Sequence, residues 1–198
     1  MNVLSRIYDA KAAVLARERE RESYDDVERR ALERLRERRP FTTGLANSDG
    51  IAIIAEIKRA SPSAGDIVKD LDVAGTARSY ASAGANAISV LTEADYFRGD
   101  LAYLDTVRRA TQLPILRKDF LWTRYQIAQS AAYGADCVLL ILAGLSDDAL
   151  FECLDEARRF DLDVLIEIHD EVELERAAAR VRRSSASIVA IYERCGST

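Results

Sequence analysis

The fold of this chain is decided by one stretch of its sequence, which reads Ile53-Ile54-Ala55-Glu56-Ile57-Lys58-Arg59-Ala60-Ser61-Pro62-Ser63. Its first half is apolar and strand-like, and the Ser-Pro-Ser segment at its end predicts a loop. Because side chains alternate along an extended chain, Glu56 and Lys58 point to the same side. The stretch therefore predicts a strand that carries an acid and an amine to its C-terminal end. On this spacing alone, a structural ion pair and a functional pair are equally good explanations.

Outward from this stretch, short apolar runs alternate with helical segments. The apolar runs are continuous, as expected of parallel strands that are buried on both faces. They are 51–57, 87–91, 115–116, 137–142 and 164–168, and the helical segments between them are 73–83, 101–110, 124–133 and 147–160. This β-α order predicts a parallel α/β fold.

A local repeat indicates a cyclic array of such units. Residues 83–88 and 133–138 share one pattern, in which a helix ends at a Gly and the chain enters the next strand. The spacing by itself leaves both a closed barrel and a doubly wound sheet open. No Gly-x-Gly-x-x-Gly follows the first strand, which argues against the dinucleotide-binding version of the sheet.

The first forty residues have a different character. Residues 2–37 show helical periodicity, with an alternating charge run at 17–22 that is typical of a solvated helix face. Pro40 ends this region. We therefore expect residues 1–40 to form a helical extension at the N-terminus of a single domain that spans 1–198.

The composition is that of a globular protein, with 48% hydrophobic and 31% charged residues. The formal net charge of −5 argues against general attraction to nucleic acid or to anionic membranes. The apolar runs are strand-sized, and the segment after Met1 is amphipathic and charged, unlike a signal peptide. We expect a cytoplasmic protein without nucleic-acid or membrane partners, in which local cations and N–H groups hold any anionic substrate.

The cysteines and the histidine do not predict a metal site. Cys137, Cys153 and Cys195 are odd in number and lack the spacing of metal ligands. Cys137 lies inside an apolar run, so we expect a small core residue there. His169 is the only histidine, and we expect it to be a supporting or loop residue.

Two further strand ends carry ionisable groups. Lys118 ends the apolar run at 115–116, and Glu167 lies within the run at 164–168. Buried ionisable groups are costly unless they are paired or functional. If the strands converge, these two residues join Glu56 and Lys58 as two acids and two bases in one cavity. Such a set suits general acid–base chemistry, because each group perturbs the pKa of its neighbours.

The stretch at 54–63 resembles the signature of the indole-3-glycerol phosphate synthase family. Four further pieces match that family in order, namely the N-terminal helix at 3–17 and the segments 89–99, 116–120 and 165–170. The resemblance covers residues 2–178 and implies a (β/α)₈ TIM barrel with an extra N-terminal helix.

The resemblance also implies an activity. The family converts 1-(2-carboxyphenylamino)-1-deoxyribulose 5-phosphate to indole-3-glycerol phosphate in tryptophan synthesis, with release of carbon dioxide and water and without metal or organic cofactor. By resemblance, Lys118 is the general acid that protonates the ribulose carbonyl as the aromatic ring attacks it. Glu167 assists by stabilising cationic character or by relaying protons.

Four other residues receive roles by the same resemblance. Lys58 pairs with the substrate carboxylate and takes part in dehydration, and Glu56 is its partner and a candidate base. Ser61 helps to bind the phosphate, and Phe97 lines the anthranilate pocket. The expected partner is a phosphorylated small molecule, and fusion to or association with other enzymes of tryptophan synthesis stays open.

The family pattern is lost after Ala179. Where the family has a sixth strand that reads roughly Gly-Ile-Asn-x-Arg-Asn-Leu, residues 180–198 read differently, and no seventh or eighth strand follows. We therefore expect an incomplete barrel of five to six strands that lacks the last two βα units, with 180–198 as an aberrant tail. Such a barrel exposes parallel edges and loses the principal phosphate site.

Back-translation indicates an origin for this tail. Residues 183–195, read from the third base of each codon, permit Leu-Ile-Gly-Ile-Asn-x-Arg-Asn-Leu-Arg-Thr-Leu, which contains the missing motif. We interpret the tail as the product of a frameshift, and a coding DNA that cannot be read in this way contradicts that interpretation.

Two alternatives to an active enzyme of this family remain. The first is an inactive remnant of the enzyme that lacks the phosphate site. The second is another phosphate-binding barrel, such as phosphoribosylanthranilate isomerase. The Glu-x-Lys-x-x-Ser-Pro-Ser run disfavours the second, since that isomerase uses a Cys/Asp acid–base pair.

Overall fold

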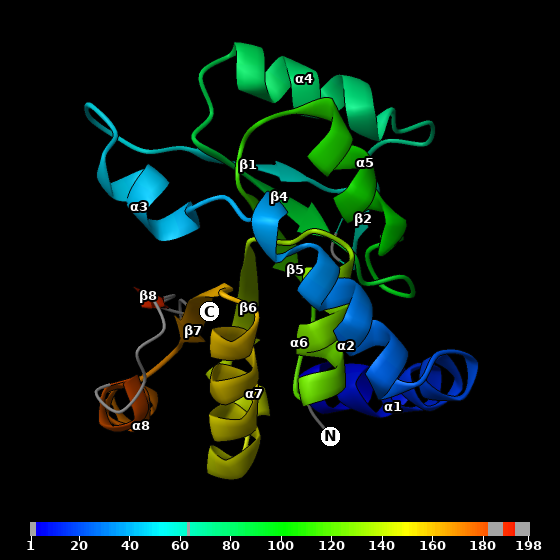
Figure 1. Cartoon of the computed structure of the whole chain (residues 1–198), viewed down its shortest axis with the longest axis vertical. Coiled ribbons are helices and arrows are strands. Elements are labelled where there is room, and N and C mark those ends of the chain that lie inside the picture. Colours follow the sequence, from blue (N-terminus) through cyan, green and yellow to red (C-terminus); the bar gives the residue numbers. More distant parts are fainter. Residues whose placement is uncertain (1–2, 63, 182–187, 193–198) are drawn as a thin grey trace.

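The computed structural model describes residues 3–62, 64–181 and 188–192. Their main sheet is six-stranded, in the order β1-β4-β5-β6-β7-β8, and every neighbouring pair in it is parallel. The strands are β1 (Ile54–Ile57), β4 (Ala87–Leu91), β5 (Ile115–Lys118), β6 (Cys137–Ile141), β7 (Asp163–Ile168) and β8 (Ile188–Tyr192). The connecting helices are α4 (Val73–Ser82), α5 (Ala102–Ala110), α6 (Arg124–Ala132), α7 (Asp147–Arg159) and α8 (Glu171–Val181). The predicted parallel α/β fold is confirmed (Figure 1).

Most of the other predicted strands and helices between residues 73 and 168 end within one or two residues of the observed bounds, and two predicted elements differ more. The first strand was predicted from residue 51 but begins at Ile54, because the segment before it has left the sheet and the side chain of Ile51 is 93% exposed. The predicted helix over 2–37 is divided into α1 (Val3–Arg21), α2 (Tyr24–Glu33) and a 3₁₀ turn, η1 (Leu35–Glu37). Ser23 causes the first break, since its side chain accepts a hydrogen bond from the backbone N–H of Asp26 and caps α2.

The tail that we predicted to be aberrant lies mostly outside the described residues. Of residues 180–198, the structure describes 180–181 as the end of α8 and 188–192 as β8. Strand β8 pairs with β7 in parallel register, from Val164 opposite Ile188 to Ile168 opposite Tyr192. These five residues therefore occupy the position that a sixth parallel strand takes beside the fifth.

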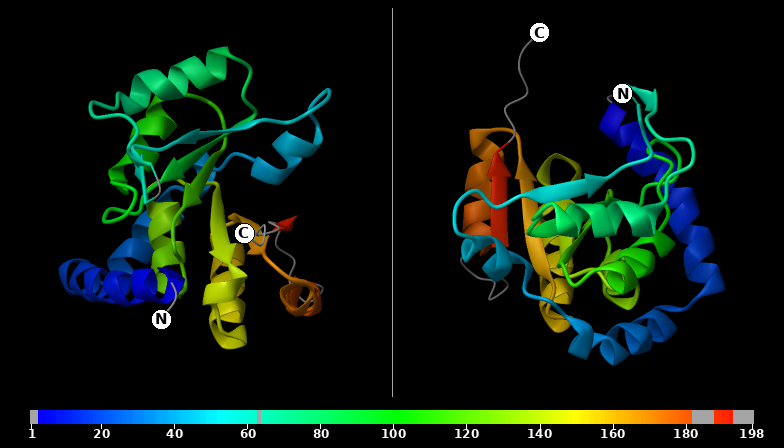
Figure 2. Two further views of the ribbon diagram at one scale, coloured as in Figure 1. Left: turned by 180° about the vertical axis from the view of Figure 1, so that it is seen from behind. Right: turned by 90° about the horizontal axis from the view of Figure 1, so that it is seen from above.

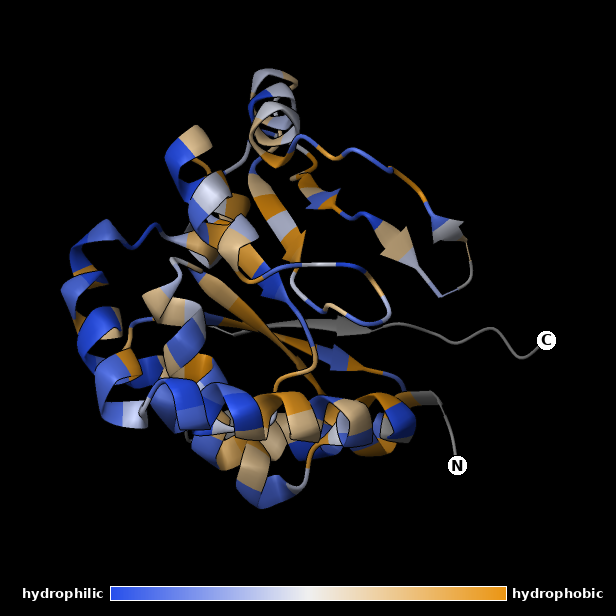
Figure 3. Ribbon diagram, turned by 90° about the vertical axis from the view of Figure 1, so that its right-hand side faces the viewer, coloured by the Kyte–Doolittle hydropathy of each residue, from blue (hydrophilic) through white to orange (hydrophobic). Residues whose placement is uncertain are grey.

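The sheet is curved, and its helices lie along its outer side (Figures 1 and 2). The inner face carries an apolar cluster that includes Leu116, Cys137, Leu139 and Leu165. The outer face packs on the helices through two further clusters. Figure 3 shows the consequence, since the strands are mainly hydrophobic and the outer helices are hydrophilic on the sides that face away from the sheet. Cys137 is fully buried in the inner cluster, as predicted.

Helix α6 is the exception among the outer helices, because protein covers it on all sides. Its residues from Tyr125 to Ala132 are all buried, and α2 packs against it. Tyr125 donates a hydrogen bond to the backbone carbonyl of Glu22 (3.1 Å). The Ala and Ser side chains of α6 are small, which suits a helix that is enclosed between the sheet and α2.

The N-terminal segment covers the curved sheet at both ends of its strands. Helix α1 crosses the C-terminal ends of the strands. Its Tyr8 lies against Gly144 in the turn η2 (Leu142–Gly144), so closely that a Cβ atom added to Gly144 would lie 2.3 Å from the Tyr8 ring. A short helix, α3 (Phe41–Ala46), lies at the opposite end of the strands. Phe41 packs into the inner cluster, and the backbone N–H of Thr42 donates to Asp163 at the start of β7 (2.8 Å).

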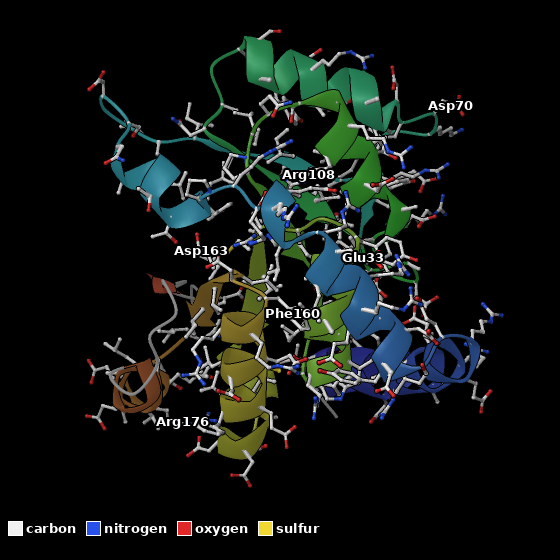
Figure 4. The ribbon with its side chains drawn as sticks, in the orientation of Figure 1. Glu33, Asp70, Arg108, Phe160, Asp163 and Arg176 are labelled. Atoms are coloured by element: carbon white, nitrogen blue, oxygen red, sulfur yellow. The ribbon has the colours of Figure 1, made fainter. Side chains whose placement is uncertain are left out.

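A buried carboxylate connects the segments that meet at the N-terminal ends of the strands. The side chain of Asp136 has no exposed surface, and it contacts Arg108 (2.6 Å) and Arg38 (3.2 Å). It also accepts from the backbone N–H groups of Arg39 and Ile115, at 2.8 Å each. Arg108, labelled in Figure 4, joins α5 to the link between α2 and α3. Asp136 therefore ties the N-terminal segment to β5 and α5.

We expect Asp136→Ala to lower the free energy of unfolding by about 3–5 kcal/mol, because it leaves two buried guanidinium groups without their counter-charge. Urea unfolding followed by circular dichroism measures this loss. Asp49→Ala is the matched control, since it removes an equal charge from an exposed loop and is expected to change stability by less than about 0.5 kcal/mol. Equal losses in both variants would contradict the structural role of Asp136.

Candidate active site

A cavity of about 400 Å³ opens at the C-terminal ends of the strands. Its lining includes Lys118 and Glu167 from strand ends, Phe97 and His169 from the loops that follow strands, and Leu4 and Ile7 from α1. A second cavity of about 200 Å³ shares Lys118, Leu139 and Glu167 with the first and adds Glu56 and Ser89. Because the two cavities share these side chains, they adjoin each other, and we treat them together as the candidate site.

Strand register explains why the charged groups meet here. Glu56 lies two residues after Ile54, Lys118 two after Leu116, and Glu167 two after Leu165. Since alternate side chains share one face of a strand, each charged residue points to the same inner face as its apolar partner. The parallel register then aligns the strands, with Glu56 opposite Ser89 and Leu91 opposite Lys118. The inner face therefore has a charged layer at the C-terminal ends of the strands and an apolar layer two residues earlier along each strand.

Glu56 bridges two lysines. One carboxylate oxygen of Glu56 lies 2.7 Å from Nζ of Lys58, and the other lies 3.0 Å from Nζ of Lys118. The predicted convergence of these three residues is therefore present in the structure. Glu167 joins them through the shared cavity lining, whereas Lys58 reaches the group through Glu56 and does not line either cavity.

The two lysines determine the charge state of Glu56. Burial alone raises the pKa of its carboxyl group, but hydrogen bonds from Lys58 and Lys118 and their positive charges outweigh burial. The net effect holds the pKa of Glu56 below its usual value. Glu56 is therefore a carboxylate at neutral pH and is able to accept a proton or hold a cation in place.

Phe97 is held in the loop after β4 by a buried glutamate. The carboxylate of Glu93 accepts hydrogen bonds from three successive backbone N–H groups, those of Asp95 (3.1 Å), Tyr96 (2.7 Å) and Phe97 (3.1 Å). The loop then returns against the strand at Gly99, where a Cβ would lie 2.4 Å from the carbonyl oxygen of Leu91. The Phe97 ring lies 6.3 Å from that of Phe120, centroid to centroid, so two aromatic side chains line one wall of the cavity.

Ser61 lies in the neighbouring loop and does not line either cavity. It belongs to a short antiparallel pair that the sequence analysis did not predict, β2 (Ala60–Ser61) with β3 (Gly65–Asp66). Its hydroxyl accepts a hydrogen bond from the backbone N–H of Ala64 (3.1 Å). The pair is joined to the Phe97 loop, because Ala60 donates to the carbonyl oxygen of Phe97 (3.2 Å) and Arg98 pairs with Asp66.

The structure adds a buried charge cluster beside Lys118 that the sequence analysis missed. Asp119 has no exposed side-chain surface and receives hydrogen bonds from Lys11 of α1, Thr92 (2.7 Å) and Arg117 (2.9 Å). Burial raises the pKa of Asp119, but the charges of Arg117 and Lys11 outweigh it, and the net pKa lies below the usual value. The cluster fixes α1 to the end of β5, directly after Lys118.

The described residues contain no group of three or more His, Cys, Asp or Glu side chains arranged to hold a metal ion. Within the same part of the chain, no helix has the length and apolar character needed to cross a membrane.

The Asp119 cluster predicts a dependence of stability on pH. Because the folded-state pKa of Asp119 lies below the unfolded value, near 3.8, its contribution is complete above that pH and disappears as the pH falls through the folded-state value. We expect Asp119→Asn to unfold about 3–5 kcal/mol more easily than wild type at neutral pH, since Lys11 and Arg117 lose their counter-charge. That difference should shrink in acid.

Urea titrations at a series of pH values measure this difference. Asp95→Asn is the control, because Asp95 is exposed in the nearby loop. A stability difference that stays constant from neutral pH to acid unfolding would mean that the Asp119 carboxylate does not carry the effect.

Comparison with known proteins identifies the family to which these features belong. The family model described as indole-3-glycerol phosphate synthase matches residues 4–194 of this chain. The match extends beyond Ala179, after which we expected the family pattern to be lost. It favours this family over phosphoribosylanthranilate isomerase.

Several curated relatives carry the same description. Indole-3-glycerol phosphate synthase 1 of Streptomyces coelicolor is 45% identical over 179 residues, which cover 89% of this chain and 65% of that protein. The protein of Nocardioides sp. is 55% identical over 130 residues, 66% of this chain and 50% of that protein. The protein of Roseiflexus castenholzii is 43% identical over 183 residues, 89% of this chain and 68% of that protein. The chain thus spans between half and about two thirds of the length of these relatives.

Two solved structures share the fold at low sequence identity. A 3-hexulose-6-phosphate synthase superposes with a TM-score of 0.52 at 15% identity, over 71% of this chain and 66% of that one. A putative isomerase from Sinorhizobium meliloti gives a TM-score of 0.54 at 10% identity, over 74% of this chain and 36% of that one. These likenesses concern the fold alone. The family model and the curated relatives agree with the motif around Glu56 and Lys58, and the chain belongs to the indole-3-glycerol phosphate synthase family.

Proposed function

We propose that this chain catalyses the ring closure of 1-(2-carboxyphenylamino)-1-deoxyribulose 5-phosphate to indole-3-glycerol phosphate. The observation that carries the proposal is the placement of Glu56, Lys58, Lys118 and Glu167 at one end of a parallel sheet, in a member of this family. Ring closure with loss of carbon dioxide and water needs proton donors and an acceptor held together in a cavity.

Lys118 is the proposed general acid. Its ammonium group faces the cavity at the end of β5, where it donates to Glu56. As the ring carbon that bears the carboxylate attacks the ribulose carbonyl, the carbonyl oxygen gains negative charge and takes a proton from Nζ of Lys118. Carbon dioxide then leaves and restores the aromatic ring. Glu167, which lines the same cavity, stabilises the cationic character that develops or relays protons.

Lys58 and Glu56 are proposed to act together in binding and dehydration. Lys58 pairs with the substrate carboxylate, and Glu56 serves as its partner and as a base. Glu56 is ionised at neutral pH, as a base must be, and the positive charges of Lys58 and Lys118 that lower its pKa also make it a weaker base. Since Glu56 holds both lysines in this structure, the substrate carboxylate must compete with Glu56 for Lys58.

The cavity suits the aromatic end of the proposed substrate. Its apolar walls include Phe97, Phe120, Leu139 and Ile141, and its volume of about 400 Å³ falls in the range of small-molecule sites. We propose that Phe97 contacts the anthranilate ring. Ser61 is proposed to help bind the phosphate, a role supported by its loop position beside Phe97.

We further propose that the curved sheet belongs to a (β/α)₈ barrel, that residues 1–198 form one domain, and that residues 1–40 are its N-terminal extension. The order of the six parallel strands and the closing of their two ends by α1 and α3 support this architecture. An incomplete barrel, an aberrant tail at 180–198, a cytoplasmic location and association with other tryptophan-synthesis enzymes remain predictions of the sequence.

Turnover of the carboxyphenylamino-deoxyribulose phosphate by the purified protein, followed by the fluorescence of the indole product, tests the proposed function. We expect Lys118→Ala to lower kcat by about 10²–10⁴-fold, since it removes the general acid. Lys69→Ala is the control, because Lys69 is an exposed lysine away from the cavities, and its kcat should equal that of wild type. Folded wild-type protein without turnover would contradict the proposal and favour the alternative that the chain is an inactive remnant of the enzyme.

The proposed role of Phe97 has its own test. We expect Phe97→Ala to raise KM about tenfold to a hundredfold with a smaller effect on kcat, because the side chain contributes apolar contact to the bound ring. Phe151→Ala is the control, since Phe151 is largely exposed on α7 and should leave both constants unchanged. A KM for Phe97→Ala equal to that of wild type would remove Phe97 from the binding site.

A further inference from the structure

The only histidine of the chain lies between two glutamates at the mouth of the cavity. Nε2 of His169 is 3.2 Å from a carboxylate oxygen of Glu167, within hydrogen-bond distance. On its other side, Nδ1 is 3.4 Å from a carboxylate oxygen of Glu173. His169 also lines the larger cavity together with Glu167. The imidazole ring thus connects the proposed proton-relay carboxylate to the first turn of α8.

The backbone of His169 is fixed by the start of that helix. The Asp170 side chain accepts a hydrogen bond from the backbone N–H of Glu173, and the Glu173 carboxylate accepts one from the backbone N–H of His169, each at 2.8 Å. This reciprocal arrangement resembles a capping box. Because β7 ends at Ile168 and α8 begins at Glu171, it leaves little freedom between strand and helix.

The two ring nitrogens of His169 face different carboxylates, Nε2 that of Glu167 and Nδ1 that of Glu173. Nδ1 is buried, and its approach to Glu173 is close in distance but does not make a hydrogen bond. The Glu173 oxygen instead serves the backbone N–H of His169. Nε2 makes the shorter of the two approaches, so an N–H at Nε2 is placed to donate to the Glu167 carboxylate. Other charged groups lie near this pair. Lys118 and Asp119 line the same cavity, Glu56 lines the adjoining cavity with Glu167, and Asp170 directly follows His169.

We propose that His169 is a positioning residue that holds the carboxylate of Glu167 at the orientation needed in the cavity. Glu167 has several rotatable bonds, and a donor on a fixed backbone removes rotamers that point away from the reacting atoms. Small misplacements of a reacting group are costly in catalysis, so the loss of this donor affects the chemical step more than binding. The catalytic consequence rests on the proposed function, whereas the contact between His169 and Glu167 does not.

Steady-state kinetics of substituted proteins test the catalytic consequence. We expect His169→Leu to lower kcat about tenfold to a hundredfold, with a smaller change in KM, because the ring nitrogen that faces the charged Glu167 carboxylate is lost. His169→Gln places an amide N–H near the position of Nε2 and should retain most of kcat. Glu171→Gln, in the same first turn of α8 but exposed, is the control and should match wild type. Equal losses in the Leu and Gln variants would overturn the proposal, since they would indicate packing alone.

The ring signals of the single histidine test the contact without turnover. In protein with ¹⁵N,¹³C-labelled histidine, we expect the NMR signals of the His169 ring to shift in Glu167→Gln and to stay unchanged in Glu171→Gln. Ring signals that do not respond to Glu167→Gln in folded protein would overturn the proposal. If folded wild-type protein shows no turnover, the proposed function fails, and the ring signals still decide whether His169 holds Glu167.

Discussion

The constraint on which the whole site depends is the alternation of side chains along parallel strands in fixed register. It allows one inner face to be apolar at Ile54, Leu116 and Leu165 and charged two residues later. A shift of one strand by a single residue would turn its charged group out of the cavity and toward the helices. The apolar layer below therefore does more than stabilise the sheet. By fixing the register, it sets the direction in which each charged side chain points.

The same constraint explains how much of the structure follows from the sequence. Continuous apolar runs predict the strands well, because parallel strands that are buried on both faces consist mainly of apolar residues. The strand at 87–91 was predicted with the boundaries that the structure has. The meeting of Glu56, Lys58 and Lys118 was also predictable, since C-terminal ends of neighbouring parallel strands lie at one edge. The break between α1 and α2 was not predicted, although Ser23, whose side chain caps α2, is a residue type favoured at helix N-termini.

Other parts of the site could not be predicted from local patterns. Glu93 organises a loop by accepting three backbone hydrogen bonds, and nothing in its neighbours distinguishes it from a solvated acid. Asp119 follows Lys118 directly, but its partner Lys11 lies more than a hundred residues earlier in the chain. The position of α1 over the cavity likewise depends on such distant contacts. Helical periodicity predicts that α1 exists and leaves its location open.

That distance along the chain has a consequence for how the protein is made. Helix α1 leaves the ribosome well before Asp119 and Gly144, which contact it in the folded protein, are synthesised. Until then α1 has no partner at the strand ends, and contacts between distant segments form slowly. Its apolar side chains Ile7 and Leu15, buried in the finished protein, stay exposed for that interval. The nascent chain therefore passes through a period in which the apolar face of α1 is exposed to solvent and α1 does not yet cover the cavity.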